Sequence, residues 1–130
     1  MNINSLIGIP YDPRSFDCAD FVIRVQRELF GRHINLPSAR PRIHEGGQRH
    51  VKDLSMQYAA PTNSPRDGDL VLMKQCGKTR ATHVGVYFFR DYEPWVLHCS
   101  EDNGFSVAQR VRELPDSSVD IEGYYTWLQT

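Results

Sequence analysis

The stretch from Arg14 to Gly31, "RSFDCADFVIRVQRELFG", contains the signals of one complete helix and carries a cysteine where that helix begins. Asp17 is suited to the N-cap position, where its carboxylate accepts hydrogen bonds from backbone N–H groups two or three residues on. Gly31 is a typical residue just past a helix end. Apolar residues between them recur with a 3.6-residue period: Cys18, Phe21, Val22, Val25 and Leu29. The sequence predicts a helix over about residues 17–30.

Loop and weaker helix signals follow this helix. Residues 32–47, "RHINLPSARPRIHEGG", contain two prolines and two glycines and are typical of a loop. Residues 48–59 predict a weaker second helix, with Val51, Leu54 and Tyr58 on one side. The next segment, "APTNSPRDGD", is rich in turn residues and predicts an irregular connection.

The second half of the chain has the pattern of short β-strands. These runs are rich in β-branched and aromatic residues, and turn residues separate them: "LVLM", "HVGVYFF", "WVLHCS", "FSVAQRV" and "EGYYTWL". Short connections favour antiparallel neighbours. We therefore expect a single α+β domain over residues 1–130, with N-terminal helices packed on a central antiparallel sheet of about five strands.

Composition excludes several classes of protein. The 130 residues include 40% hydrophobic and 24% charged residues, and the net charge is −1. Nothing in this charge indicates nucleic-acid binding. No apolar run approaches the roughly 18 residues of a membrane span, so we expect no membrane insertion. The start, "MNINSLIGIPYDP", lacks the basic and apolar regions of a secretory signal.

The chain has three cysteines, Cys18, Cys76 and Cys99, and their number and spacing match neither a disulfide framework nor a zinc finger. Three interpretations of Cys18 remain open. It is a buried apolar residue on the helix stripe, a metal ligand or a nucleophile. The third has a physical basis, because the positive end of a helix dipole lowers the pKa of a thiol in the first turn.

A thiol nucleophile also requires a base, and the chain has five histidines. His33 follows the helix and should lie roughly 20 Å from Cys18 at 1.5 Å per residue. His44 and His50 belong to a polar, basic segment and should be solvated. His83 and His98 remain as candidates, because each is embedded in a predicted strand.

Strand alternation predicts that His83 and His98 share one face of the sheet. The prediction holds if the hairpin between them has an even number of loop residues, such as the four of "RDYE", and no bulge. His83 would then accept the Cys18 proton or form an ion pair with the thiolate, and His98 would orient His83. Cys99 should point to the opposite face. The same three residues could instead bind zinc, although their separation in sequence is not typical of a zinc site.

Several motifs in one order resemble the NlpC family of papain-like cell-wall cysteine peptidases, in the small form found in bacteriophage tail proteins. "GIPYDPRSFDCADFV" is similar to the approach to the catalytic cysteine, and "VQRELFG" to the continuation of its helix. "PRDGDLVLM" resembles the Pro-Gly-Asp turn into the first strand, with two residues inserted after Pro65. "HVGVYF", "VLHCSEDNG" and "IEGYYTWL" resemble the later strands.

The resemblance implies a papain-like NlpC fold with Cys18 as nucleophile, His83 as base and His98 as orienting residue. Tyr11 would line the cleft and help to hold the substrate or the oxyanion. The implied substrate is the stem peptide of bacterial peptidoglycan, cut next to a D-glutamyl residue. Neither a metal nor another cofactor is implied.

The chain departs from the family pattern after the cysteine. The family usually has Ser or Trp and then Gly, where this chain has Ala19 and Asp20. Asp20 would raise the thiol pKa if it lay close to the sulfur. If Asp20 faced solvent instead, it would be a substrate-binding residue for the amine of the stem peptide.

Two roles follow from the resemblance. The first is a peptidase that opens peptidoglycan as a phage enters the cell. The alternative is a structural tail-tip or tail-assembly component whose catalysis is dispensable. Both imply a protein carried on the virion beside other tail-tip proteins, made in the host cytoplasm without a signal peptide.

Overall fold

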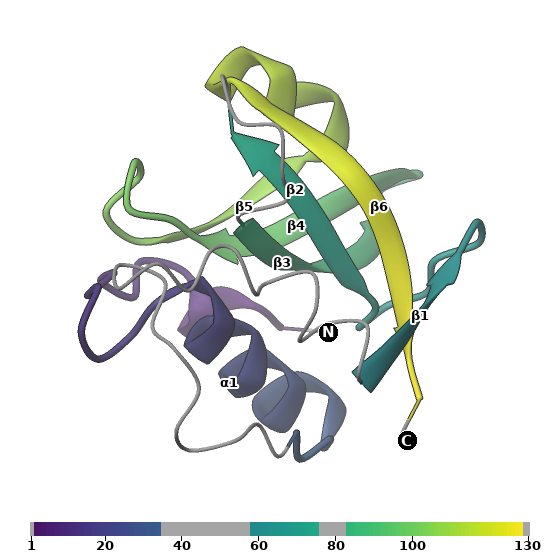
Figure 1. The fold of residues 1–130 in the computed structure, drawn as a ribbon, viewed down its shortest axis with the longest axis horizontal. Coiled ribbons are helices and arrows are strands. Elements are labelled where there is room, and N and C mark those ends of the chain that lie inside the picture. The colour runs from purple at the N-terminus through teal and green to yellow at the C-terminus, as the bar shows by residue number, and fades with distance from the viewer. Residues whose placement is uncertain (1, 35–57, 76–82, 129–130) are drawn as a thin grey trace.

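The computed structural model describes residues 2–34, 58–75 and 83–128, and they form one α+β domain (Figure 1). Helix α1 lies on one side of a sheet and the short 3-10 helix η4 on the other. The elements are η1 (Asn4–Leu6), α1 (Cys18–Phe30), β1 (Ala59–Thr62), β2 (Leu70–Gln75), β3 (His83–Arg90), β4 (Glu93–Cys99), β5 (Ser106–Arg110), η4 (Val111–Ser117) and β6 (Val119–Trp127). The predicted fold class is confirmed.

Helix α1 begins and ends where the sequence predicts. The Asp17 carboxylate accepts hydrogen bonds of 3.1 Å from the backbone N–H groups of Ala19 and Asp20. The Asp20 carboxylate accepts one of 3.0 Å from the Asp17 N–H, which completes a capping box. Gly31 ends the helix in the left-handed conformation at φ 61°.

The sheet has six antiparallel strands in the order β1-β6-β2-β3-β4-β5. The extra strand relative to the predicted five is β1, in which residues 60–62 belong to the segment expected to be an irregular connection. Pro61 has no backbone N–H to donate, and it fits in β1 because β1 is an edge strand of the described sheet. Figure 1 shows β1 and β6 side by side at the right of the sheet.

A tight hairpin joins β3 and β4. Its loop contains two residues, Asp91 and Tyr92, instead of four, and both have positive φ angles of 53° and 64°. This conformation matches the right-handed twist of paired strands. The loop count is even and the β3–β4 register has no shift, so the strand faces coincide as expected.

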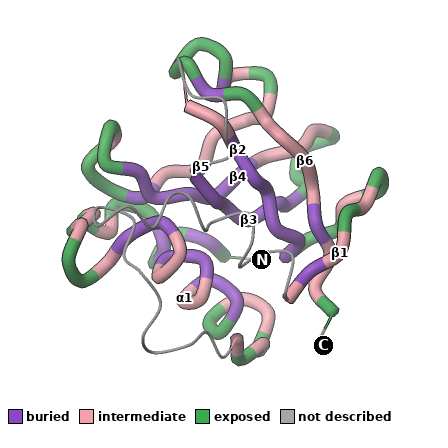
Figure 2. Tube along the Cα trace, in the orientation of Figure 1, coloured by how far each residue is buried: buried purple, intermediate pink, exposed green. Residues whose placement is uncertain are grey.

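Two apolar clusters cover the two faces of the sheet, and Figure 2 shows that burial is concentrated in the central strands. The first cluster joins α1 to β3 and β4 and includes Cys18, Phe21, Val25, Val84, Val86, Phe88, Leu97 and Cys99. The second lies on the η4 side and includes Val71, Met73, Tyr87, Val96, Leu114 and Val119. Strand alternation therefore assigns the odd-numbered residues of β3 to the η4 side.

The predicted second helix over residues 48–59 falls almost entirely outside the described residues, apart from its end, where Ala59 already belongs to β1. None of the helices in the described ranges has the length and apolar character needed to span a bilayer.

Candidate active site

The best-defined polar feature of the interior is a pair of histidines on β3 and β4. His98 lies opposite Gly85, two residues after His83, so the two imidazoles are diagonal neighbours on the η4 face. His83 Nε2 lies 2.8 Å from His98 Nδ1, and the rings meet edge to face with centroids 5.0 Å apart. Only 3% of His83 and 1% of His98 is exposed. The sequence prediction that these residues meet is confirmed.

The hydrogen-bonded chain continues beyond the histidines. His98 Nε2 lies 2.7 Å from the side-chain oxygen Oε1 of Gln109, which is on β5. Gln109 Nε2 donates to Ser117 Oγ in η4 over 3.2 Å. Gln109 was not identified from the sequence, because its position beside His98 depends on the register between β4 and β5. One nitrogen of the pair, His83 Nδ1, has no hydrogen-bond partner among the described residues.

Burial keeps both imidazoles neutral. It lowers the pKa of His83 well below its usual 6.5, and the neighbouring His98 adds to this effect. Burial also lowers the pKa of His98, although the hydrogen bond with Gln109 opposes the change. A neutral His83 has a lone pair with which to accept a proton. Each imidazole therefore holds a lone pair at neutral pH, but its lowered pKa makes it a weaker base than a solvated histidine.

Cys18 is the first residue of α1 and is 2% exposed. It belongs to the same apolar cluster as Val84 and Cys99, the residues that follow His83 and His98 in the chain. Unpaired N–H groups at a helix start create a positive potential that favours a thiolate and other anions. The fold thus combines a core position for Cys18 with the environment of a reactive thiol.

The two halves of the candidate site belong to different sides of the sheet. Cys18 packs on the α1 side, whereas alternation along β3 assigns His83 to the η4 side. His83 is the first residue of β3, which begins at the end of the sheet where β4 finishes with Cys99. Contact between thiol and imidazole therefore has to form around this end of the sheet.

Tyr11 lies at this same end. Its backbone N–H donates to the carbonyl of Gly104 over 2.9 Å, and the adjacent Pro10 forms a β-bridge with Phe105. Burial raises the pKa of the Tyr11 hydroxyl, and the charges of Cys18 and Asp17 raise it further. Tyr11 is therefore close enough to Cys18 for the charge of a thiolate to act on its hydroxyl. The hydroxyl keeps its proton at neutral pH and remains a hydrogen-bond donor.

A comparison with known families covers most of the chain. The sequence model of the NlpC/P60 family matches residues 10–120, which include Tyr11, Cys18, His83 and His98. The chain belongs to the NlpC/P60 family. This is a family of cysteine peptidases with a general role in the cleavage of cell-wall peptides. No curated protein and no solved structure matches the chain.

Within this NlpC/P60 domain, Asp20 has a local structural role. Its carboxylate accepts the Asp17 N–H and so helps to fix the turn that carries Cys18. Substrate binding by Asp20 stays a prediction. The side chain occupies the first turn of α1, where the helix dipole stabilises a negative charge.

Among the described residues, Cys99 and His33 take no part in this chain of contacts. Cys99 Sγ is 3.7 Å from the carbonyl oxygen of Ile9, and burial, followed by the charge of Asp17, raises the pKa of the Cys99 thiol to about 11. Cys99 packs on the α1 side, opposite to His98, as expected. His33 is exposed beyond the end of α1. Cys76, His44 and His50 lie outside the described residues. In the described ranges, no three His, Cys, Asp or Glu side chains gather as metal ligands.

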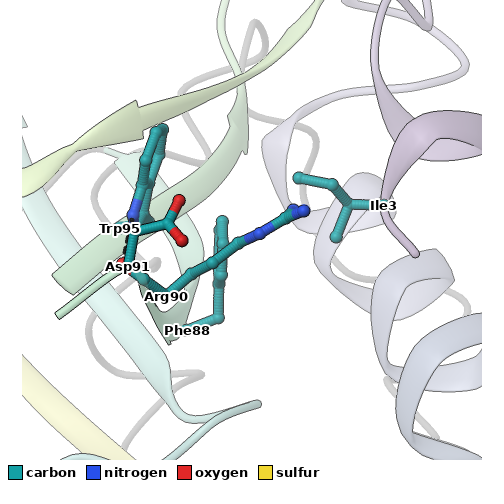
Figure 3. Close-up of a pocket in the computed structure, with 5 residues that line it drawn as sticks. All are labelled: Ile3, Phe88, Arg90, Asp91 and Trp95. Carbon is teal, nitrogen blue, oxygen red and sulfur yellow. Dashed lines mark hydrogen bonds between the residues drawn. The ribbon is translucent and has the colours of Figure 1, made fainter. Parts of the chain in front are cut away.

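Two hollows lie away from the histidine pair. One, of about 160 Å³, is at the hairpin end of β3 and β4 and is lined by Ile3, Phe88, Arg90, Asp91 and Trp95. Figure 3 shows the Arg90 side chain extending past Phe88 toward Ile3. The other, of about 450 Å³, is lined by Arg32, Arg66, Asp67, Asp69, Thr126 and Trp127. Neither is lined by a thiol or an imidazole, so neither carries the family chemistry.

Proposed function

We propose that this NlpC/P60 protein is a cysteine endopeptidase or amidase that cleaves peptide bonds in peptidoglycan stem peptides. The observation that carries the proposal is the 2.8 Å contact between His83 Nε2 and His98 Nδ1. The contact engages Nε2 of His83, while Nδ1 has no hydrogen-bond partner among the described residues and serves Cys18 in the proposed mechanism. In a catalytic triad the base is oriented in this way by a third residue.

In the proposed reaction, His83 Nδ1 accepts the proton of the Cys18 thiol as the sulfur attacks the carbonyl carbon of the scissile bond. A backbone N–H at the start of α1 and the Tyr11 hydroxyl donate to the resulting oxyanion. The His83 imidazolium then protonates the leaving amine as the C–N bond breaks, and a thioester with Cys18 remains.

Hydrolysis of the thioester repeats these steps with water. His83 Nδ1 accepts a proton from the water molecule as its oxygen attacks the thioester carbon. The C–S bond breaks, the proton returns to the Cys18 sulfur and the product leaves as a carboxylic acid. Burial keeps His83 neutral, so its lone pair is free to accept a proton in both halves of this cycle.

Incubation with purified muropeptides, followed by mass spectrometry of the products, tests the activity. Wild type should release shortened stem peptides, and Cys18→Ala should release none while keeping the circular dichroism of wild type. Cys99→Ala is a matched control, because it removes a second buried cysteine of the same apolar cluster. Equal turnover by wild type and Cys18→Ala would refute the assignment of the nucleophile.

We further propose that the protein acts at the tail tip of a phage virion, beside other tail proteins. The support is the similarity of "VQRELFG" and "IEGYYTWL" to phage-type members of the family. Mass spectrometry of purified virions should detect the chain. Its absence from virions that contain the other tail proteins would refute this location.

One observation favours the alternative, a structural tail-tip component with dispensable catalysis. Cys18 and His83 are almost fully buried, as the side chains of a structural core would be. Complementation of a phage deletion with Cys18→Ala separates the two roles. Normal assembly with impaired infection supports the peptidase, whereas normal infection of thick-walled cells supports the structural role.

A further inference from the structure

We propose that Gln109 is a positioning residue that fixes the tautomers of both histidines and thereby places the basic lone pair on His83 Nδ1. The inference rests on the proposed peptidase function and deepens it. Gln109 is the third member of the hydrogen-bonded chain His83–His98–Gln109, and it acts on the reaction only through the imidazoles.

The amide of Gln109 determines which nitrogen of His98 carries a proton. Its Oε1 lies 2.7 Å from His98 Nε2, and its Nε2 donates to Ser117 Oγ over 3.2 Å. A side-chain carbonyl oxygen only accepts hydrogen bonds, so His98 Nε2 must carry a proton. The donor in this contact is therefore His98.

The neutral state of His98 determines the role of its other ring nitrogen. A neutral imidazole carries one proton, so a proton on Nε2 leaves Nδ1 as an acceptor. His83 Nε2, 2.8 Å away, must then be the donor in the contact between the rings. Because His83 is also neutral, its Nδ1 has no proton and keeps a free lone pair. Gln109 thus sets the direction of hydrogen-bond donation, which runs from His83 to His98 to Gln109.

The opposite direction would disable the base. If His98 carried its proton on Nδ1, it would donate to His83 Nε2, and His83 would hold its own proton on Nδ1. A protonated Nδ1 cannot accept the thiol proton. The hydroxyl of Ser117 in η4 accepts from Gln109 Nε2, which restrains the position of the amide group.

Three variants isolate this role. Gln109→Met keeps the length and much of the volume of the side chain but removes the acceptor. Gln109→Glu keeps an acceptor oxygen. Gln75→Met is the matched control, because Gln75 is a half-buried glutamine on β2 with no hydrogen bond from its side chain among the described residues. Circular dichroism and thermal unfolding select variants that remain folded.

Nitrogen NMR of the imidazoles reads the tautomers directly, without substrate. In wild type and Gln109→Glu, both His83 and His98 should show a protonated Nε2 and an unprotonated Nδ1. In Gln109→Met, protonated Nδ1 signals should appear for both rings, while Gln75→Met should match wild type. Protonated Nδ1 signals in wild type, or wild-type tautomers in Gln109→Met, would overturn the proposal.

Kinetics on muropeptides give the second measurement. Gln109→Met should lower kcat by about 10²- to 10⁴-fold with little change in KM, as expected when a base is held in the wrong tautomer. Gln109→Glu should recover most of the loss. Unchanged kcat in folded Gln109→Met would refute the positioning role. An inactive wild type with the expected NMR tautomers would refute the peptidase function and leave the proton arrangement intact.

Discussion

Gly85 lies directly opposite His98 across the β3–β4 pair, and the space between them has no room for another side-chain atom. A Cβ at Gly85 would lie 2.7 Å from Val96 Cγ1, 2.8 Å from the Leu97 carbonyl oxygen and 3.0 Å from His98 Cβ. One of these contacts is with backbone, which cannot move aside as a flexible side chain can. The glycine therefore sets the close approach of strand β4 that brings His98 to His83.

Gly85→Ala is expected to separate β3 from β4 locally. We expect the free energy of unfolding to fall by about 1–3 kcal/mol, as for other overpacked interiors, and muropeptide cleavage to fall with it. Urea denaturation measures the first effect. Gly123→Ala on β6 is the matched control, because its Cβ would meet its nearest neighbour at an ordinary 3.5 Å. Equal stability of the two variants would contradict the expected crowding at Gly85.

The buried histidines should make the protein sensitive to acid. Their pKa values are lowered on folding, so below the usual pKa of 6.5 the unfolded chain binds protons that the folded protein does not. The free energy of unfolding should therefore decrease as the pH falls below 6.5, by up to about 1.4 kcal/mol per pH unit for each histidine. Denaturation curves at several pH values measure this slope.

The variant His83→Gln/His98→Gln provides the comparison for the acid effect. Carboxylates also contribute to acid unfolding, but they do so equally in both proteins. We expect a shallower dependence on pH in the double variant from 6.5 down to about pH 5. Parallel curves for the two proteins would mean that the histidines do not resist protonation.

The sequence predicted the features that depend on local pattern. Helix α1 followed from Asp17, the apolar stripe and Gly31, and all three act as expected. The shared face of His83 and His98 was predicted from the two-residue period of a strand. The predicted loop length of four residues was wrong, but the observed two-residue loop is also even, so the two strand faces still coincide. Periodicity and local capping were sufficient in both cases.

The features that the sequence did not predict depend on pairing between distant segments. Ala59–Thr62 contains a proline and overlaps the start of a turn-rich run, and it becomes a strand because β6 pairs with it. Tyr92 adopts a left-handed conformation that bulky residues seldom adopt, so the two-residue loop had no sequence signal. Gln109 reaches His98 only through the register of β4 with β5.

Variants of Asp20 test whether its carboxylate binds the substrate in addition to capping helix α1. Asp20→Ala should lower the free energy of unfolding by about 0.3–1.5 kcal/mol, because the Asp17 N–H loses its acceptor. Asp20→Asn keeps an acceptor oxygen and should lose less. If a positively charged stem peptide binds Asp20, Asp20→Asn should raise KM with little change in kcat. An unchanged KM would limit Asp20 to capping.

Tyr11→Phe removes the hydroxyl that the proposed mechanism directs at the oxyanion. We expect kcat to fall by about 10²- to 10³-fold, the usual effect of deleting one oxyanion donor, with a smaller change in KM. The Tyr11 backbone N–H keeps its bond with Gly104, so the loop should be retained. Tyr124→Phe on β6 is a control for loss of a half-buried tyrosine hydroxyl. Similar kcat values in both variants would exclude Tyr11 from the reaction.

The position of β6 between β1 and β2 has a consequence for biosynthesis. A ribosome makes β1 and β2 before β6, and β6 follows every other strand of the described sheet in the sequence. Until then β1 has no partner in the sheet, and one side of β2 has unpaired N–H and C=O groups. The nascent chain would therefore hold Cys18 in an unfinished domain, and the sheet that carries His83 and His98 would be completed only after β6 has been made.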